Sequence, residues 1–228
     1  MFCHNCGTQI SPDLQFCPTC GQSLAPGPMV SGAAAWTPPA GIRSQTGRWI
    51  GEGWRMVKAD IGMYILLALI TILLSSVPFI QGPLTAGFFI VCMKRTLNRT
   101  ADFADLFTGF NFFIPALVAS LVIALFVFVG TVFCIIPGLV VAAMYKFTYL
   151  FIVDKRMDFW PAMQASHAVV RNDYFGFTMF LIVLALVNLL GLICCIVGVL
   201  VTMPVTMAAI TVAYKEIVGF DQRTVASL

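Results

Sequence analysis

Three long apolar runs constrain this chain more than any other feature of its sequence. They cover Ile61–Ile80, Phe112–Ile136 and Phe175–Val197, and each is long enough to cross a bilayer as a helix. Of the 228 residues, 60% are hydrophobic and 10% are charged, whereas soluble domains carry roughly 25% charged residues. A soluble fold of this size could not hide so much apolar surface. The sequence therefore predicts an integral membrane protein.

A second apolar run follows each of these after a short break that contains Gly or Pro. The second runs are Pro83–Leu97, Pro137–Val153 and Val199–Tyr214. In lipid the backbone must satisfy its own hydrogen bonds, so each run is expected to be a helix. The breaks favour tight turns, which would join the six helices into three hairpins. The expected fold class is an all-α polytopic membrane protein over residues 48–220, with amphipathic interfacial helices leading into the hairpins.

The positions of the cations predict the orientation. Apart from Lys146, every Lys and Arg lies in the N-terminal approach, in the connections 94–111 and 154–174, or in the tail 221–228 and the helix end before it. Since cytoplasmic loops are the positive ones, both termini are expected in the cytoplasm, at the plasma or inner membrane. The second helix of the first hairpin is short, because the segment from Pro83 to Lys94 would be only about 16 Å long as a helix. A re-entrant arm there would invert the topology that follows.

The first 24 residues contain two CxxCG motifs. Two residues between cysteines let one tight turn present both sulfurs to a single tetrahedral ion, and the following Gly gives the backbone room to fold back. Four thiolates suit one structural Zn²⁺, with iron as the alternative and no open position for catalysis. A redox dithiol is disfavoured because no βαβ pattern surrounds the motifs. The expected metal ligands are Cys3, Cys6, Cys17 and Cys20.

At CHNCG and FCPTCG the chain resembles a short zinc ribbon of the kind found at the N-terminus of many prokaryotic proteins. This expected domain, residues 1–24, has no Lys or Arg, whereas phosphate binding needs cations, so nucleic acid is not an expected partner. A small, nearly neutral, partly apolar domain suits contact with a protein. Residues 25–47 are rich in Pro, Gly and Ala and are expected to be a flexible linker.

Lys146 is the one ionisable side chain well inside an apolar run, which makes it a functional candidate. The alternative is that it extends towards the cytoplasmic face near Asp154. From about residue 48 to 220, and most distinctively over residues 137–175, the chain resembles uncharacterised bacterial six-span membrane proteins, a family with no assigned reaction. The matching positions are Pro137, Gly138, Asp154, Ala162, Ser166 and Asn172. A possible membrane polar site therefore comprises Lys146, Asp154, Ser166 and Asn172.

Structural roles are the default for two of these residues. Asp154 can cap the following surface helix or pair with Lys155 or Arg156, and Asn172 can cap the next span. The sequence contains no H-E-x-x-H motif and no pair of acids within the spans, so an enzyme is not expected. The expected function is a scaffold, regulator or assembly factor in the lipid bilayer, with the ribbon binding a protein partner. The alternative is a small transporter or lipid-handling protein with Lys146 lining a path.

Overall fold

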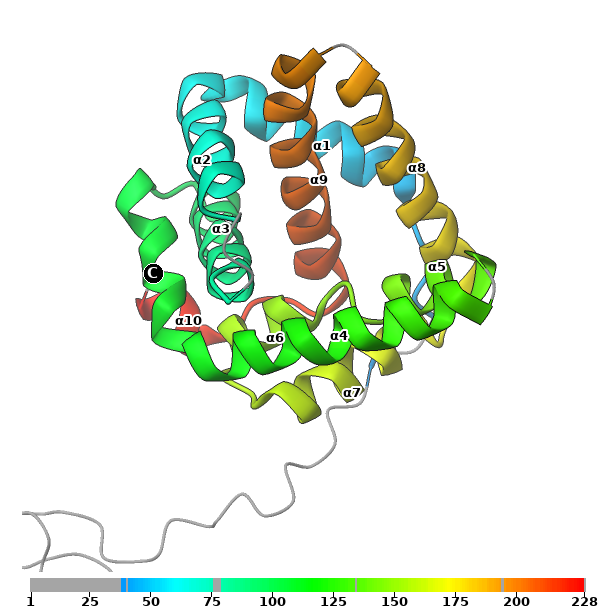
Figure 1. The fold of residues 1–228 in the computed structure, drawn as a ribbon. Helices are drawn as coiled ribbons and strands as arrows, with labels where there is room; N and C mark the ends of the chain where they lie inside the picture. The colour runs from blue at the N-terminus through cyan, green and yellow to red at the C-terminus, as the bar shows by residue number, and fades with distance from the viewer. Residues whose placement is uncertain (1–37, 40, 76–78, 134, 194, 228) are drawn as a thin grey trace, which may run out of the picture. The chain divides into compact units, whose positions relative to one another are not determined.

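The computed structural model describes residues 38–39, 41–75, 79–133, 135–193 and 195–227. The chain divides into two units, Met1–Trp36 and Thr37–Leu228. The expected zinc ribbon and its four cysteines lie in the first unit, outside the described residues. In the described part of the second unit every regular element is a helix, which confirms the all-α class (Figure 1).

The helix α1 (Thr46–Ala59) is amphipathic and packs into the helical core. Trp49, Gly53 and Val57, four residues apart, form its buried face. Gly53 lies against α9 (Cys195–Ile217), where a Cβ would come within 2.8 Å of the backbone nitrogen of Ala209. The absence of a side chain at Gly53 therefore lets α1 cross α9 at close range.

The first hairpin consists of α2 (Ile61–Leu74) and α3 (Gln81–Thr96). A bend of 100° separates α1 from α2. Most positions of α3 from Gly82 to Met93 are buried, because the 3-10 helix η1 (Phe103–Phe112) packs on it closely.

The second and third hairpins both close on a pair of facing glycines. In α4 (Phe113–Phe133) and α5 (Ile135–Met144), a Cβ on Gly130 would lie 3.1 Å from the Cα of Gly138. In α8 (Tyr174–Ile193) and α9, a Cβ on Gly191 would lie 3.0 Å from the carbonyl oxygen of Gly198. Contacts between small residues let membrane helices approach closely.

Three short helices complete the described part. After α5 the chain continues as α6 (Thr148–Lys155), and α7 (Phe159–Val170) then packs against α6. The last element is α10 (Gln222–Ser227), which follows α9.

Among the described residues four helical segments are long and apolar enough to cross a membrane. They are Phe103–Phe133, Pro137–Lys155, Tyr174–Ile193 and Gly198–Ile217, and the bent pair α1 and α2 could make a fifth. The 16 residues of α3 span about 24 Å, less than the roughly 30 Å of hydrocarbon in a bilayer. In Figure 1, α4 runs across the direction of α8 and α9. The six-span arrangement of three parallel hairpins therefore remains a prediction.

Candidate functional site

The second arm of the middle hairpin is interrupted where α5 gives way to α6. The helix α5 ends at Met144 and α6 begins at Thr148. Between them the N–H of Lys146 donates to the carbonyl of Ala143 at 3.2 Å, three residues back, and not to the regular i−4 partner. Such a break frees backbone groups that cannot reach water inside a membrane, so something else must satisfy them.

Ser166 of α7 satisfies this break from both sides. Its hydroxyl donates to the carbonyl of Met144 at 2.6 Å and accepts from the N–H of Phe147 at 3.2 Å. Ser166 is fully buried, and so is Ala162 one turn earlier on the same helix. Small side chains at these two positions leave room for α7 to approach the break closely.

Lys146 lies at the break and is half-buried. It lines a cavity of about 160 Å³ together with side chains from α3, α4 and α9. The wall includes Phe89 and Tyr149, whose rings stack with centroids 6.5 Å apart. None of the described lining residues is acidic, and Asp154 is not among them. Lys146 therefore faces a small, mostly apolar space.

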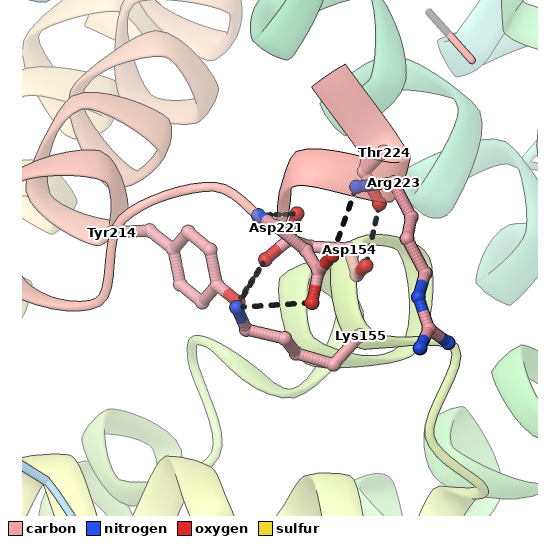
Figure 2. A network of polar contacts seen from close by, with 6 residues as sticks. All are labelled: Asp154, Lys155, Tyr214, Asp221, Arg223 and Thr224. Atoms are coloured by element: carbon pink, nitrogen blue, oxygen red, sulfur yellow. Dashed lines mark hydrogen bonds and ion pairs between the residues drawn. The ribbon is translucent and has the colours of Figure 1, made fainter. Parts of the chain in front are cut away.

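Asp154 is the centre of a separate polar cluster at the end of α6 (Figure 2). The residue is 2% exposed. The carboxylate accepts hydrogen bonds from the Tyr214 hydroxyl and from the backbone N–H of Asp221, each at 2.9 Å. The amine of Lys155 lies 3.5 Å away, and the hydroxyl of Thr224 donates to the Asp154 carbonyl at 2.6 Å.

These contacts tie three elements together, because Asp154 lies in the last turn of α6, Tyr214 lies near the end of α9 and Thr224 belongs to α10. Buried carboxylates are tolerated only when they are paired and hydrogen-bonded, and Asp154 meets that condition. Asp221 completes the cluster at its edge. The backbone N–H of Arg223 donates to its side chain at 3.0 Å, and this bond and the nearby Lys155 lower the pKa of Asp221 despite some burial.

The expected capping role of Asp154 is wrong. The helix α7 begins after Asp158, and Asp154 points instead into the contacts with α9 and α10. Of the two cations proposed as its partners, Lys155 forms the ion pair. Arg156 adopts a left-handed conformation, with φ of 50°, that ends α6.

Asn172 lies apart from both places, and its expected role as the cap of the next span is also wrong. Its amide donates backwards to the carbonyl of Ala168 at 2.9 Å, at the end of α7. The cap of α8 is the next residue, Asp173, which accepts from the N–H of Gly176 at 2.9 Å and from the N–H of Ser44 at 3.1 Å. Burial raises the pKa of Asp173, but these two bonds, together with the Ser44 side chain and the nearby Arg43, hold the pKa below its usual range.

The four residues of the possible membrane polar site therefore do not meet in one place. Ser166 contacts the backbone on both sides of Lys146, whereas Asp154 and Asn172 each serve a different helix end. The sequence interpretation missed the partners of Asp154, which are Tyr214, Asp221 and Thr224. The only sequence feature that could have indicated them is that all three are polar residues at or shortly after the end of the last apolar run.

Residues 2–24 match the zinc-ribbon domain family. The chain carries an N-terminal zinc-ribbon domain. The matched segment includes all four CxxCG cysteines, and a domain of this kind generally binds zinc in a structural role.

Two uncharacterized mycobacterial proteins are similar to the chain over a longer segment. They are Mb2590 of Mycobacterium bovis and Rv2560 of Mycobacterium tuberculosis, each 26% identical over 134 residues. The match covers 59% of this chain and 41% of each relative, so the chain spans less than half of these relatives. No solved structure gives a significant match.

Proposed function

We propose that this protein is a non-enzymatic integral membrane protein that displays its zinc ribbon to the cytoplasm as a protein-interaction module. It would act as a scaffold, regulator or assembly factor for other membrane components. The observation that carries the proposal is one chain with both a zinc-ribbon domain at residues 2–24 and four helical segments apolar enough to span a membrane. A closed shell of four thiolates leaves the zinc no position for a substrate, so the ribbon serves recognition.

The proposed topology has six spans with both termini in the cytoplasm. The charges of the described residues support it, because they gather where the hairpins begin and end. Arg95 pairs with Asp60 at the base of the first hairpin, and Lys94 pairs with Asp105 at 2.7 Å. At the end of the third, Glu216 of α9 pairs with a cation of α1. An excess of cations at these helix ends would keep this side of the protein in the cytoplasm.

The test compares the full chain with two variants of the first knuckle. Cys3→Ser combined with Cys6→Ser removes two proposed ligands, whereas His4→Ala alters the same turn and leaves all four thiolates. We expect one zinc per chain in the wild type and in His4→Ala by elemental analysis, and loss of zinc in the double variant. Proteins that co-purify with the wild type should be lost in the double variant and retained in His4→Ala. Unchanged co-purifying proteins in the double variant would contradict the proposed role.

A second candidate is a small transporter or lipid-handling protein with Lys146 lining a path. The observation that favours it is the interrupted helix beside a cavity, because irregular backbone at membrane depth is typical of places that line a cavity. Lys146→Met should then abolish the phenotype that the gene supports in its host. Exposed Lys58→Met on α1 is the matched control. A fully functional Lys146→Met variant would exclude this candidate.

A further inference from the structure

A basic pocket lies between α1, the end of α3 and the end of α9, and it shares no lining residue with the cavity beside Lys146. Its volume is about 670 Å³. Its described lining residues carry four cations against two carboxylates. The charged residues are Arg55, Arg95, Arg99, Lys215, Glu52 and Asp60.

Two of the cations, Arg95 and Lys215, already have close partners. Asp60 pairs with Arg95, and Lys215 donates to the carbonyl of Thr96 at 3.1 Å, which offsets the negative end of the α3 dipole. The closest approach of Glu52 and Arg55 is 3.8 Å, in an exposed pair of the kind that contributes little.

Within the described part of the chain, the guanidinium groups of Arg55 and Arg99 are therefore the ones that remain available to a ligand. The side chain of Arg55 is 77% exposed, and Arg99 is exposed as well. A guanidinium matches the oxygens of a phosphate with two parallel hydrogen bonds.

The wall that carries Arg99 is fixed by the way α3 ends. Asn98 adopts a left-handed conformation with φ of 56°. Its N–H donates to the carbonyl of Arg95, and the N–H of Arg99 donates to the carbonyl of Lys94, each at 3.0 Å. These two bonds form a Schellman motif, which stops the helix and turns the chain sharply. Arg99 is thus held at the pocket by backbone geometry, and binding need not order this turn.

We propose that this pocket binds the phosphate of an anionic membrane phospholipid. A lipid is favoured over a soluble phosphate because the pocket lies at the charged helix ends, beside apolar surface that an acyl chain can follow. On α2, which begins at the pocket, Leu66, Leu69 and Leu73 are 43%, 50% and 71% exposed. Basic pockets between helices at the cytoplasmic side of a membrane suit anionic headgroups. The inference rests on membrane integration but not on the role of the zinc ribbon.

The test uses the full chain in a neutral maltoside detergent with three probes. These are short-chain phosphatidylglycerol, phosphatidylcholine with the same chains, and inorganic phosphate, with affinity measured by microscale thermophoresis. The variant Arg55→Gln with Arg99→Gln removes both available cations. Lys58→Gln with Arg171→Gln removes two exposed cations from positions that do not line the pocket. Size-exclusion elution and helical circular dichroism establish that each variant is folded.

We expect phosphatidylglycerol to bind the wild type more tightly than either other probe. The pocket variant should bind it roughly thirtyfold more weakly, since each cation near an anionic lipid contributes about 1 kcal/mol and 1.4 kcal/mol is a factor of ten. The control variant should bind within about threefold of the wild type. Equal binding of phosphatidylglycerol and phosphatidylcholine, equal loss in both variants, or inorganic phosphate binding as tightly as the lipid would overturn the proposal. Loss of zinc or of protein partners would leave this result unchanged, so the two proposals fail independently.

Discussion

The hydrogen bonds of Ser166 make a sharp prediction about the interrupted helix. In Ser166→Ala the carbonyl of Met144 and the N–H of Phe147 lose a partner that no water can easily replace, because the serine is fully buried. A buried group left without a partner costs about 1–3 kcal/mol in soluble proteins. Bonds between helices of a membrane protein average about 0.6 kcal/mol and reach about 1.7. With two groups affected, we expect the free energy of unfolding to fall by about 2 kcal/mol.

The assay is denaturant unfolding of the purified protein in detergent, followed by circular dichroism. Hydrogen exchange adds a local readout, because the amide of Phe147 should exchange faster in the variant than in the wild type. Ser120→Ala is the matched control, since the Ser120 hydroxyl donates within its own helix, to the carbonyl of Leu117 at 2.7 Å. Its effect should stay within about 0.5 kcal/mol. If Ser166→Ala cost no more than Ser120→Ala, the serine hydroxyl would not be what stabilises the break.

Three further outcomes are expected. A Cβ at Gly87 would overlap a backbone carbonyl of η1, so Gly87→Ala should cost about 3 kcal/mol or more in unfolding experiments, whereas Gly62→Ala, which has open space, should be neutral or stabilising. Equal effects of the two substitutions would contradict this packing. Asp154→Asn keeps the bond from Thr224 to the backbone carbonyl but removes the charge that pairs with Lys155 and one of the two carboxylate acceptors, so it should weaken the attachment of α10 and speed tryptic cleavage after Arg223; an unchanged cleavage rate would argue against the carboxylate as its anchor. Asp173→Asn should destabilise the protein near neutral pH, because the folded-state pKa of Asp173 is lowered. This stabilisation is present above the unfolded pKa of about 4 and is lost as the pH falls through the lower folded value, so wild type and variant should converge in acid.

Hydropathy predicted the helical class well because apolar run length and composition are local properties of the sequence. The third hairpin illustrates this, since the run expected from Phe175 corresponds to a helix that begins at Tyr174. Hydropathy cannot show an interruption whose cause lies elsewhere in the chain. The run Pro137–Val153 is mostly apolar, with Lys146 as its one charged residue, and its break is stabilised by a serine 19 residues beyond Phe147.

The polar residues of the candidate sites were predictable as residues of interest but not in their partners. Asn172 and Asp173 are adjacent and both can cap a helix, so only the position where α8 begins decides between them. Asp154 is bonded across 60 residues to Tyr214, and no periodicity links two such positions. The Gly130 and Gly138 contact is likewise tertiary, because a glycine in a hairpin is equally compatible with a turn or with close packing.

The Asp154 cluster has a consequence for how the chain is made. The Asp154 carboxylate is synthesised 60 residues before the phenol and 67 before the amide that donate to it, and the Asp154 carbonyl 70 before the hydroxyl that donates there. While translation crosses that interval, the half-inserted polypeptide holds a carboxylate without these donors at what will become a dry position. If translation stops within that interval, the truncated product has an Asp154 carboxylate that lacks its donors. A quality-control protease would then have an exposed acidic site to recognise.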